Sequence, residues 1–284
     1  MKIGVLGIGL MGQAIATTLS SNYEVIAYNR SPEKLAALEV QKMETTTKAQ
    51  QAIAIADHLI LTLSDAAAIE LVLWGEKTNS LRSKTIIQMG TIAPEESKKI
   101  AQRVIAEGGK YLEAPVLGSI PEAKTGKLLV MVGGEEDVFQ DCLPILATLG
   151  EQPNYIGAVG EAAALKLALN QLIAALTAGF SLSLGLIQRE NVDVEKFMAI
   201  LRDSALYAPT FDKKLQRMGD RHFENPNFPT KHLLKDTKLF LQAAQEVSLN
   251  TIGLEGTQKI IEQAIAASLA DTDYSAIYNI IVPE

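Results

Sequence analysis

The sequence has little of what metal centres and disulfide frameworks require. Its 284 residues include one cysteine, Cys142, and three histidines without ligand-like spacing. A single cysteine excludes an internal disulfide framework and any cysteine-cluster metal site. We therefore expect no bound metal and a reducing, cytoplasmic compartment.

Positive charge is also scarce. The 26 lysines and arginines are outnumbered by 33 aspartates and glutamates, which leaves a net charge of -7. This excess of acid argues against nucleic acid or an anionic membrane as the main partner. The length and the hydrophobic content of 48% suit a two-domain globular protein.

What the sequence does contain is a glycine-rich turn between a strand pattern and a helix pattern. Residues 2–6 form a β-branched run, and a helical pattern extends to about residue 20. Between the two patterns lies the G-x-G-x-x-G hexapeptide Gly7-Ile8-Gly9-Leu10-Met11-Gly12. In this context the motif predicts a Rossmann unit, because the glycines allow a tight turn and close approach of the backbone to a pyrophosphate.

The end of the next strand, residues 24–28, favours one of the two nicotinamide cofactors. NAD-binding units usually carry an acidic residue about 20 residues beyond the glycines, to hold the ribose 2′-hydroxyl. This chain has Asn29-Arg30-Ser31 instead. Since a guanidinium can pair bidentately with a 2′-phosphate, we expect NADP(H) to be preferred over NAD(H).

Strand and helix patterns continue to alternate up to residue 158. Further strands are expected at residues 58–63, 85–89, 110–113, 128–132 and 153–156. This alternation predicts an α/β domain of Rossmann type, with a doubly wound, mostly parallel sheet. The loops Leu63-Ser64 and Gly90-Thr91 should then lie at the carboxyl edge of the sheet, beside the cofactor.

From Gly160 onward the pattern is helical. An apolar stretch to residue 187 predicts one long helix, in which Lys166 is the only charged residue between Glu161 and Arg189 and Asn170 shares its face one turn later. A buried lysine is costly unless something uses it; a snorkelling stem is the alternative. The stretch could span a bilayer by length, but it carries Lys166, Asn170 and Gln171 in one half and has no aromatic belt, so we expect no membrane span.

The remaining helices are expected near residues 194–203, 210–218, 230–244 and 253–267. Residues 1–158 thus form a predicted NADP-binding domain, and residues 159–284 an all-α substrate and dimerisation domain joined to it by the long helix. The abundance of apolar helical surface favours a homodimer or homotetramer formed through the helical domain.

With these motifs in place, the whole chain resembles the β-hydroxyacid dehydrogenases. The family's cofactor motif G-x-G-x-M-G matches the glycine-rich turn, and its substrate motif D-x-P-x-S-G-x-x-x-A-x-x-G is similar to residues 113–126. The catalytic motif G-x5-K-x3-N matches Gly160, Lys166 and Asn170, and the C-terminal K-D pair matches Lys235-Asp236. The resemblance is greatest to the glyoxylate/succinic semialdehyde reductase branch, whose members prefer NADPH.

The resemblance implies hydride transfer from NADPH to the carbonyl of a small, carboxylate-bearing aldehyde or keto acid, giving a hydroxy acid. Lys166 would protonate the developing alkoxide, its pKa lowered by burial, and Asn170 would hold the same oxygen or the lysine. The substrate is expected at Thr91, Leu117, Gly118, Ser119, Lys235 and Asp236. The cofactor is expected at Gly7, Ile8, Gly9, Leu10, Met11, Gly12, Asn29, Arg30, Ser31, Leu63, Ser64, Thr91 and Lys235.

Two positions depart from the family pattern and leave alternatives open. Leu117 stands where the substrate motif has serine, and Gly90-Thr91 replaces the usual Ser-Thr. Both changes remove hydroxyls, which suggests a bulkier or less acidic substrate. The alternatives are a 3-hydroxyisobutyrate-type dehydrogenase with Lys166 as base, an imine reductase, whose lysine is typically replaced, and a non-catalytic NADP-binding protein.

Overall fold

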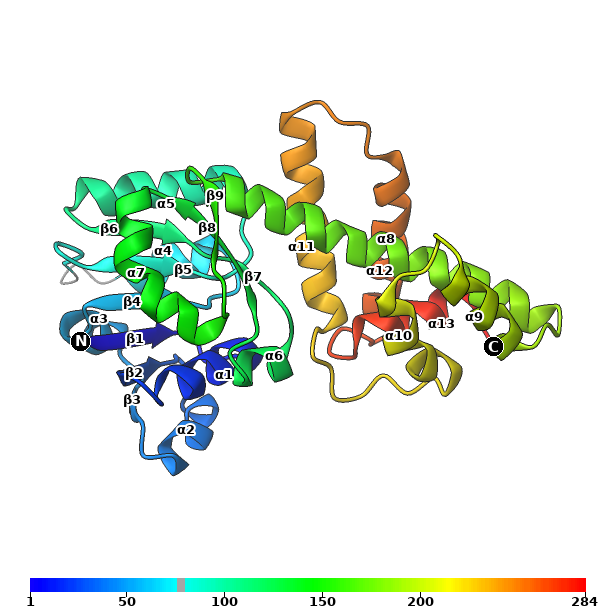
Figure 1. Ribbon diagram of the computed structural model, residues 1–284, viewed down its shortest axis with the longest axis horizontal. Coiled ribbons are helices and arrows are strands. Elements are labelled where there is room, and N and C mark those ends of the chain that lie inside the picture. Colours follow the sequence, from blue (N-terminus) through cyan, green and yellow to red (C-terminus); the bar gives the residue numbers. More distant parts are fainter. Residues whose placement is uncertain (76–79) are drawn as a thin grey trace. The chain divides into compact units, whose positions relative to one another are not determined.

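The computed structural model describes residues 1–75 and 80–284, which form two compact units, Met1–Lys166 and Leu167–Glu284 (Figure 1). The division falls inside the long helix α8 (Glu161–Arg189). The boundary expected from the sequence, near residue 158, lies just before the helix begins.

The first unit is organised around a twisted sheet in which β3, β2, β1, β4, β5 and β6 lie in this order and are all parallel. This is the strand order of a doubly wound Rossmann fold. Beyond β6 the sheet continues with antiparallel β8, which pairs with β7 and with β9. The strands are β1 (Lys2–Leu6), β2 (Glu24–Tyr28), β3 (Glu44–Thr46), β4 (His58–Leu61), β5 (Thr85–Gln88), β6 (Lys110–Glu113), β7 (Val116–Leu117), β8 (Leu129–Gly134) and β9 (Asn154–Gly157).

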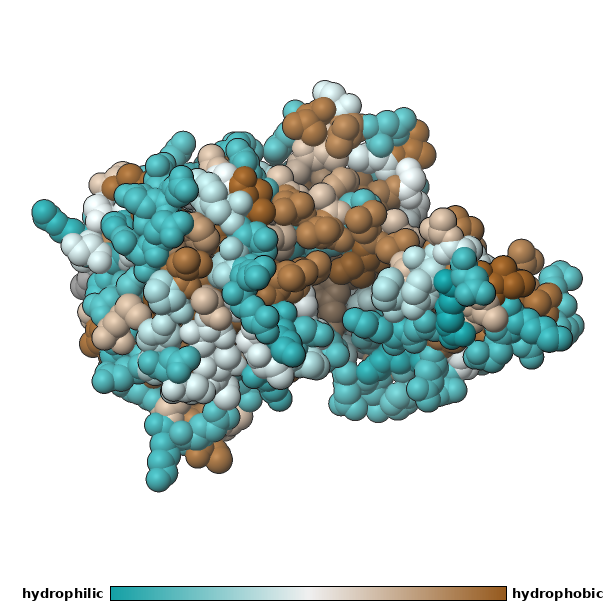
Figure 2. All heavy atoms as spheres, in the orientation of Figure 1, coloured by the Kyte–Doolittle hydropathy of each residue, from teal (hydrophilic) through white to brown (hydrophobic). Residues whose placement is uncertain are grey.

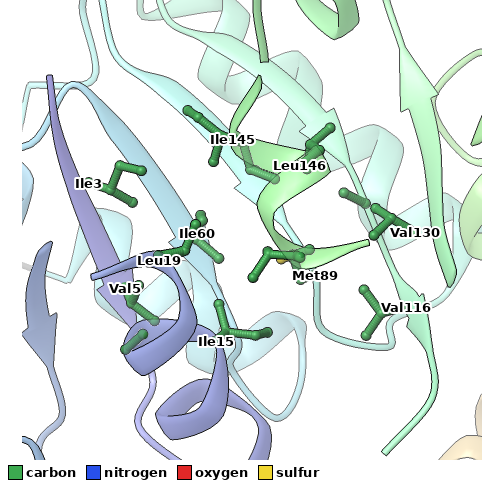
Figure 3. Packing of buried hydrophobic residues seen from close by; sticks show 14 of the residues in the cluster. Ile3, Val5, Ile15, Leu19, Ile60, Met89, Val116, Val130, Ile145 and Leu146 are labelled. Atoms are coloured by element: carbon green, nitrogen blue, oxygen red, sulfur yellow. The ribbon is translucent and has the colours of Figure 1, made fainter. Parts of the chain in front are cut away.

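Helices cover both faces of this sheet, because alternate strand residues point to opposite sides. Ile60 of β4 belongs to one apolar core, and its neighbours Leu59 and Leu61 belong to the other. Figure 3 shows the first core, in which β1 packs against Ile15 and Ile145 from two helices. That face carries α1 (Leu10–Leu19), α2 (Ala36–Val40), α6 (Ile120–Lys124) and α7 (Glu136–Leu149), and the opposite face carries α3 (Ala49–Ile55), α4 (Ala66–Trp74) and α5 (Pro94–Ala106).

The second unit is helical throughout its described elements. The greater part of α8 contributes Ala174 and Ala178 to one core and Phe180 and Leu184 to another. Small residues at the first pair let the partner helices approach closely. The other helices are α9 (Val194–Asp203), α10 (Pro209–Gly219), α11 (Thr230–Glu246), α12 (Ile252–Ala266) and α13 (Tyr278–Ile281).

The predicted fold class is confirmed: a Rossmann-type α/β unit is followed by an all-α unit. Each predicted strand and helix is present, with ends that differ by two residues or fewer. The sequence pattern missed α2, β3, α3, β7, α6 and α13. These elements are two to seven residues long, too short for a periodicity of 2.0 or 3.6 to stand out.

Candidate active site

The turn between β1 and α1 places its three glycines in three different environments. Gly7 has a φ of +107°, a left-handed conformation that favours glycine. A Cβ on Gly12 would lie 2.1 Å from the carbonyl oxygen of Gly7, so α1 packs directly on the turn. A Cβ on Gly9 would meet nothing within 4 Å. Gly7 thus allows the turn, Gly12 allows the close packing of the helix, and Gly9 leaves open space for a ligand.

The N-terminus of α1 is suited to bind an anion. Its N-cap, Gly9, makes no side-chain cap, and the first turn contains no acidic residue. The first intrahelical bond runs from Gln13 N to Gly9 O at 2.9 Å, so the amides of Leu10, Met11 and Gly12 have no partner within the helix. Such amides at the positive end of a helix bind phosphate groups. The residues present therefore fit a dinucleotide.

Asn29 ties the end of β2 to this turn. Its Oδ1 accepts from Ile8 N at 3.0 Å, and its Nδ2 donates to Ser31 O at 3.1 Å. The Asn29 side chain is buried, whereas Arg30 is exposed and Ser31 is half-buried. The residues expected at the cofactor therefore have different roles. The Asn29 amide shapes the turn, whereas the Arg30 guanidinium is exposed to solvent.

The loops after β4 and β5 lie side by side, as the parallel sheet predicts. A Cβ on Gly90 would lie 2.5 Å from the carbonyl oxygen of Leu63. Glycine at this position is therefore explained by the close approach of the neighbouring loop. The Ser64 hydroxyl donates to Asp65 Oδ2 at 2.7 Å, and Thr91 is half-buried beside Gly90.

The segment similar to the family's substrate motif forms a short strand and a capped helix. Leu117 is half-buried in β7 and pairs with Leu129 of β8. Gly118 has a φ of +131°. The backbone amide and the hydroxyl of Ser119 both donate to Glu122 Oε2, at 2.8 and 2.6 Å, in a capping box that starts α6. The Ser119 hydroxyl thus uses its one proton on Glu122 and is left with acceptor capacity only.

The polar residues along α8 are of two kinds. Thr177 and Ser181 donate to carbonyl oxygens one turn back, at 2.6 and 2.7 Å, so they serve the helix itself. Lys166 and Asn170 are 9% and 3% exposed, one turn apart on the same face.

Asn170 is held by Asp236, the second residue of the K-D pair in α11. Its Nδ2 donates to Asp236 Oδ2 at 2.6 Å, with both side chains buried. Lys235 Nζ lies 3.0 Å from Asp236 Oδ1, within ion-pair distance, although no hydrogen bond reaches that oxygen. Asn170 Oδ1 is buried without a hydrogen-bond partner. An unpartnered buried acceptor costs about 1–3 kcal/mol, which is a reason to expect that a ligand satisfies it.

Two buried polar residues at strand ends were not among the expected site residues. Gln88, the last residue of β5, is 1% exposed, and its Oε1 has no hydrogen-bond partner. Glu113, the last residue of β6, is also buried and accepts three hydrogen bonds. A glutamine or glutamate at a strand end gives no periodic signal. Among residues 1–75 and 80–284, no group of three or more histidine, cysteine or acidic side chains could hold a metal ion.

Comparison with known proteins matches both halves of the chain. Residues 2–160 match the NAD binding domain of 6-phosphogluconate dehydrogenase, and residues 160–281 match the NAD-binding domain of NADP-dependent 3-hydroxyisobutyrate dehydrogenase. The chain is 28% identical to glyoxylate/succinic semialdehyde reductase 1 of Arabidopsis thaliana, over 99% of this chain and 98% of that protein. It is 31% identical to 2-hydroxy-3-oxopropionate reductase of Escherichia coli, over 98% and 96%.

Solved structures share the fold. The 3-hydroxyisobutyrate dehydrogenase of Salmonella typhimurium matches with a TM-score of 0.86 at 20% identity, over 99% of both chains. That of Mycobacterium tuberculosis matches with a TM-score of 0.87 at 20% identity, over 98% of both chains. Together with the matches to both family domains and the 31% identity to a full-length reductase, this shows that the chain belongs to the NAD(P)-dependent β-hydroxyacid dehydrogenases.

Proposed function

We propose that the chain is an NADPH-dependent reductase of a small aldehyde or keto acid that bears a carboxylate, of the glyoxylate/succinic semialdehyde type. The observation that carries this proposal is the pair of buried polar side chains, Lys166 and Asn170, one turn apart on an otherwise apolar helix. The activities for which the two reductases at 28% and 31% identity are named support the substrate class.

In the proposed mechanism, a nicotinamide cofactor would, when bound, supply a hydride to the carbonyl carbon. Negative charge then develops on the carbonyl oxygen, and the ammonium of Lys166 donates a proton to it. The Asn170 amide is oriented by its bond to Asp236, which directs a free Oδ1 toward an N–H or O–H donor such as the ammonium or the product hydroxyl. A neutral amide suits this role, because a carboxylate there would favour the protonated lysine and retain its proton.

The cofactor preference is proposed to rest on Arg30. It is an exposed cation at the end of β2, where NAD-binding units place an acid. Residues 29–31 include no carboxylate, so nothing there would repel a 2′-phosphate. Met1–Lys166 would then be the NADP-binding unit, and the helical unit would supply Lys235 and Asp236 at the substrate end.

The direct test is Lys166→Ala, assayed with NADPH and glyoxylate or succinic semialdehyde. The kcat should fall on the order of 10²–10⁴-fold, the range for loss of a general acid, while the dissociation constant of NADPH stays unchanged. Lys238→Ala is the matched control, because Lys238 is an exposed lysine of α11 paired with Glu262 at 3.0 Å. A Lys166→Ala variant that keeps near-full kcat overturns the assignment.

A second candidate is a protein that binds the cofactor without turnover. The chain is 28% identical to the cytokine-like nuclear factor N-PAC of Xenopus tropicalis, over 98% of this chain and 53% of that protein. The same assay separates the two functions. Loss of NADPH absorbance with any small aldehyde in a panel excludes a non-catalytic protein, and binding of NADPH without turnover of any of them supports it.

A further inference from the structure

The first turn of α8 is capped by a residue far away in the sequence. Gly160 is the N-cap, because its carbonyl oxygen accepts the first intrahelical bond from Ala164 N at 2.9 Å. Most N-cap residues accept an amide proton with a Ser, Thr, Asp or Asn side chain, which glycine lacks. Glu113 supplies the acceptor instead. Its Oε1 accepts from Gly160 N at 2.8 Å and from Ala163 N at 3.0 Å, the N-cap and N3 amides that a capping box satisfies locally.

The Glu113 carboxylate is built into the nucleotide-binding unit. It is 1% exposed, and its Oε2 accepts from the Ser97 hydroxyl. Ser97 Oγ also lies 2.9 Å from the Tyr111 hydroxyl, which must donate, because the single Ser97 proton goes to Glu113. Burial raises the pKa of Tyr111, so Tyr111 keeps this proton. A Cβ on Gly133 would lie 2.6 Å from Glu113 Oε1, so β8 leaves space for the carboxylate only as glycine.

The hydrogen bonds of Glu113 indicate a structural role for the first residue of the substrate-like motif. Glu113 occupies the acidic position of the segment similar to the family's substrate motif, yet its three bonds go to the protein. Two of them hold the turn just before Lys166, which lies three residues after Ala163, or about 4.5 Å further along the helix axis. Because a helix is stiff over one turn, fixing the N-cap and N3 amides fixes the backbone of the lysine.

We propose that Glu113 is a positioning residue for the reaction: it caps α8 in place of a Gly160 side chain and so holds the turn that carries Lys166. This inference rests on the proposed role of Lys166 as proton donor. It assigns to Glu113 an effect on kcat, with no contact to the substrate.

The test compares Glu113→Ala, which removes the acceptor, with Glu113→Gln, which keeps the length and one acceptor oxygen. In Glu113→Ala we expect kcat to fall about 10–100-fold, as displacements near 1 Å do. The dissociation constant of NADPH should stay within about twofold, since the glycine-rich turn is untouched. Hydrogen exchange of the Gly160 and Ala163 amides should become faster. Glu113→Gln should recover most of the lost kcat and the protection.

Asp193→Ala is the matched control, because Asp193 caps α9 through a bond from Lys196 N at 2.9 Å and plays no part in the site. Its kcat should equal that of the wild type. A Glu113→Ala variant with wild-type kcat, or with unchanged exchange of the two amides, overturns the proposal. Should that variant not fold, Ser97→Ala decides: kcat is expected to fall several-fold, and a wild-type kcat overturns the proposal.

The experiments distinguish a wrong assignment of Lys166 as proton donor from a wrong role of Glu113. In that case Lys166→Ala keeps its kcat, while amide exchange in Glu113→Ala still reports whether the carboxylate caps the helix.

Discussion

Arg30 is the residue on which the proposed preference for NADPH rests. Its neighbour Asn29 is occupied by bonds to Ile8 N and Ser31 O, so it shapes the turn instead of reaching outward. The exposed guanidinium is the group left to meet a 2′-phosphate.

We predict that Arg30→Ala raises the KM for NADPH by about tenfold or more, since a charge-assisted bond contributes about 1.5–3 kcal/mol, and leaves the KM for NADH little changed. Steady-state kinetics with each cofactor measures this. Lys34→Ala, in the short 3-10 helix Pro32–Lys34 that follows, is the control for loss of a positive charge. An equal loss with both cofactors would remove Arg30 from the 2′-phosphate site.

The two departures from the family pattern have different physical explanations. Gly90 is required by the Leu63 carbonyl oxygen, 2.5 Å from where its Cβ would lie, so this departure carries no information about the substrate. Leu117 is half-buried in β7, where it pairs with Leu129 of β8. The substrate question therefore narrows to Leu117, next to a Ser119 hydroxyl that already donates to Glu122.

At the scale of elements, the β1–α1 turn shows how one motif combines a packing requirement with a binding requirement. A Cβ on Gly12 would lie 2.1 Å from the carbonyl oxygen of Gly7 and 2.6 Å from Thr62 Oγ1. Gly9 has a φ of -94°, which any residue adopts, and has open space beside it. The two glycines can therefore be separated by mutation.

We predict that Gly12→Ala lowers the free energy of unfolding by about 1–3 kcal/mol, the usual cost of overpacking. Gly9→Ala should keep or slightly raise stability, by up to about 1 kcal/mol, yet weaken NADPH binding at least tenfold, because the methyl group occupies the approach to the helix N-terminus. Urea unfolding and fluorescence titration with NADPH measure the two effects. A Gly9→Ala variant with normal affinity would contradict a pyrophosphate at this turn.

At the scale of the whole molecule, the helical unit carries much exposed apolar surface. In Figure 2, hydrophobic side chains gather over α8 and α11. On α8, Leu182 and Leu186 are 61% and 62% exposed, and Leu172 is 47% exposed. The helix is long and apolar enough to cross a membrane by composition, a test that the core helix of a soluble protein also passes. Exposed apolar surface of this kind commonly marks a protein–protein interface, which supports our proposal of a homodimer or homotetramer.

We predict that the double substitution Leu182→Asp and Leu186→Asp shifts the protein toward monomer, because charges at an apolar interface are costly to desolvate. Sedimentation velocity over a range of concentrations measures this. Ile105→Asp is the control, since Ile105 is 56% exposed on α5 of the nucleotide-binding unit. A wild type that is monomeric at all concentrations, or a double variant that associates like the wild type, would contradict the prediction.

The sequence by itself determined the fold class and the position of the long apolar helix that carries Lys166. Local periodicity and glycine spacing suffice for these, because strands, helices and the β1–α1 turn are specified by residues close together in the chain. Lys166 and Asn170 were identified by their spacing on one apolar helix, and β1, β2 and β6 were predicted with their observed bounds.

Only the tertiary structure decided what partners the polar groups have. Glu113 meets Gly160 and Ala163 across a separation of 47 and 50 residues, and Asn170 meets Asp236 across 66. Hydrogen bonds between distant residues leave no periodic pattern, so the sequence could assign Glu113 to the substrate motif but could not show that it caps α8. The sequence likewise could not show why residue 90 is glycine, because the explanation is the Leu63 carbonyl oxygen on the neighbouring loop.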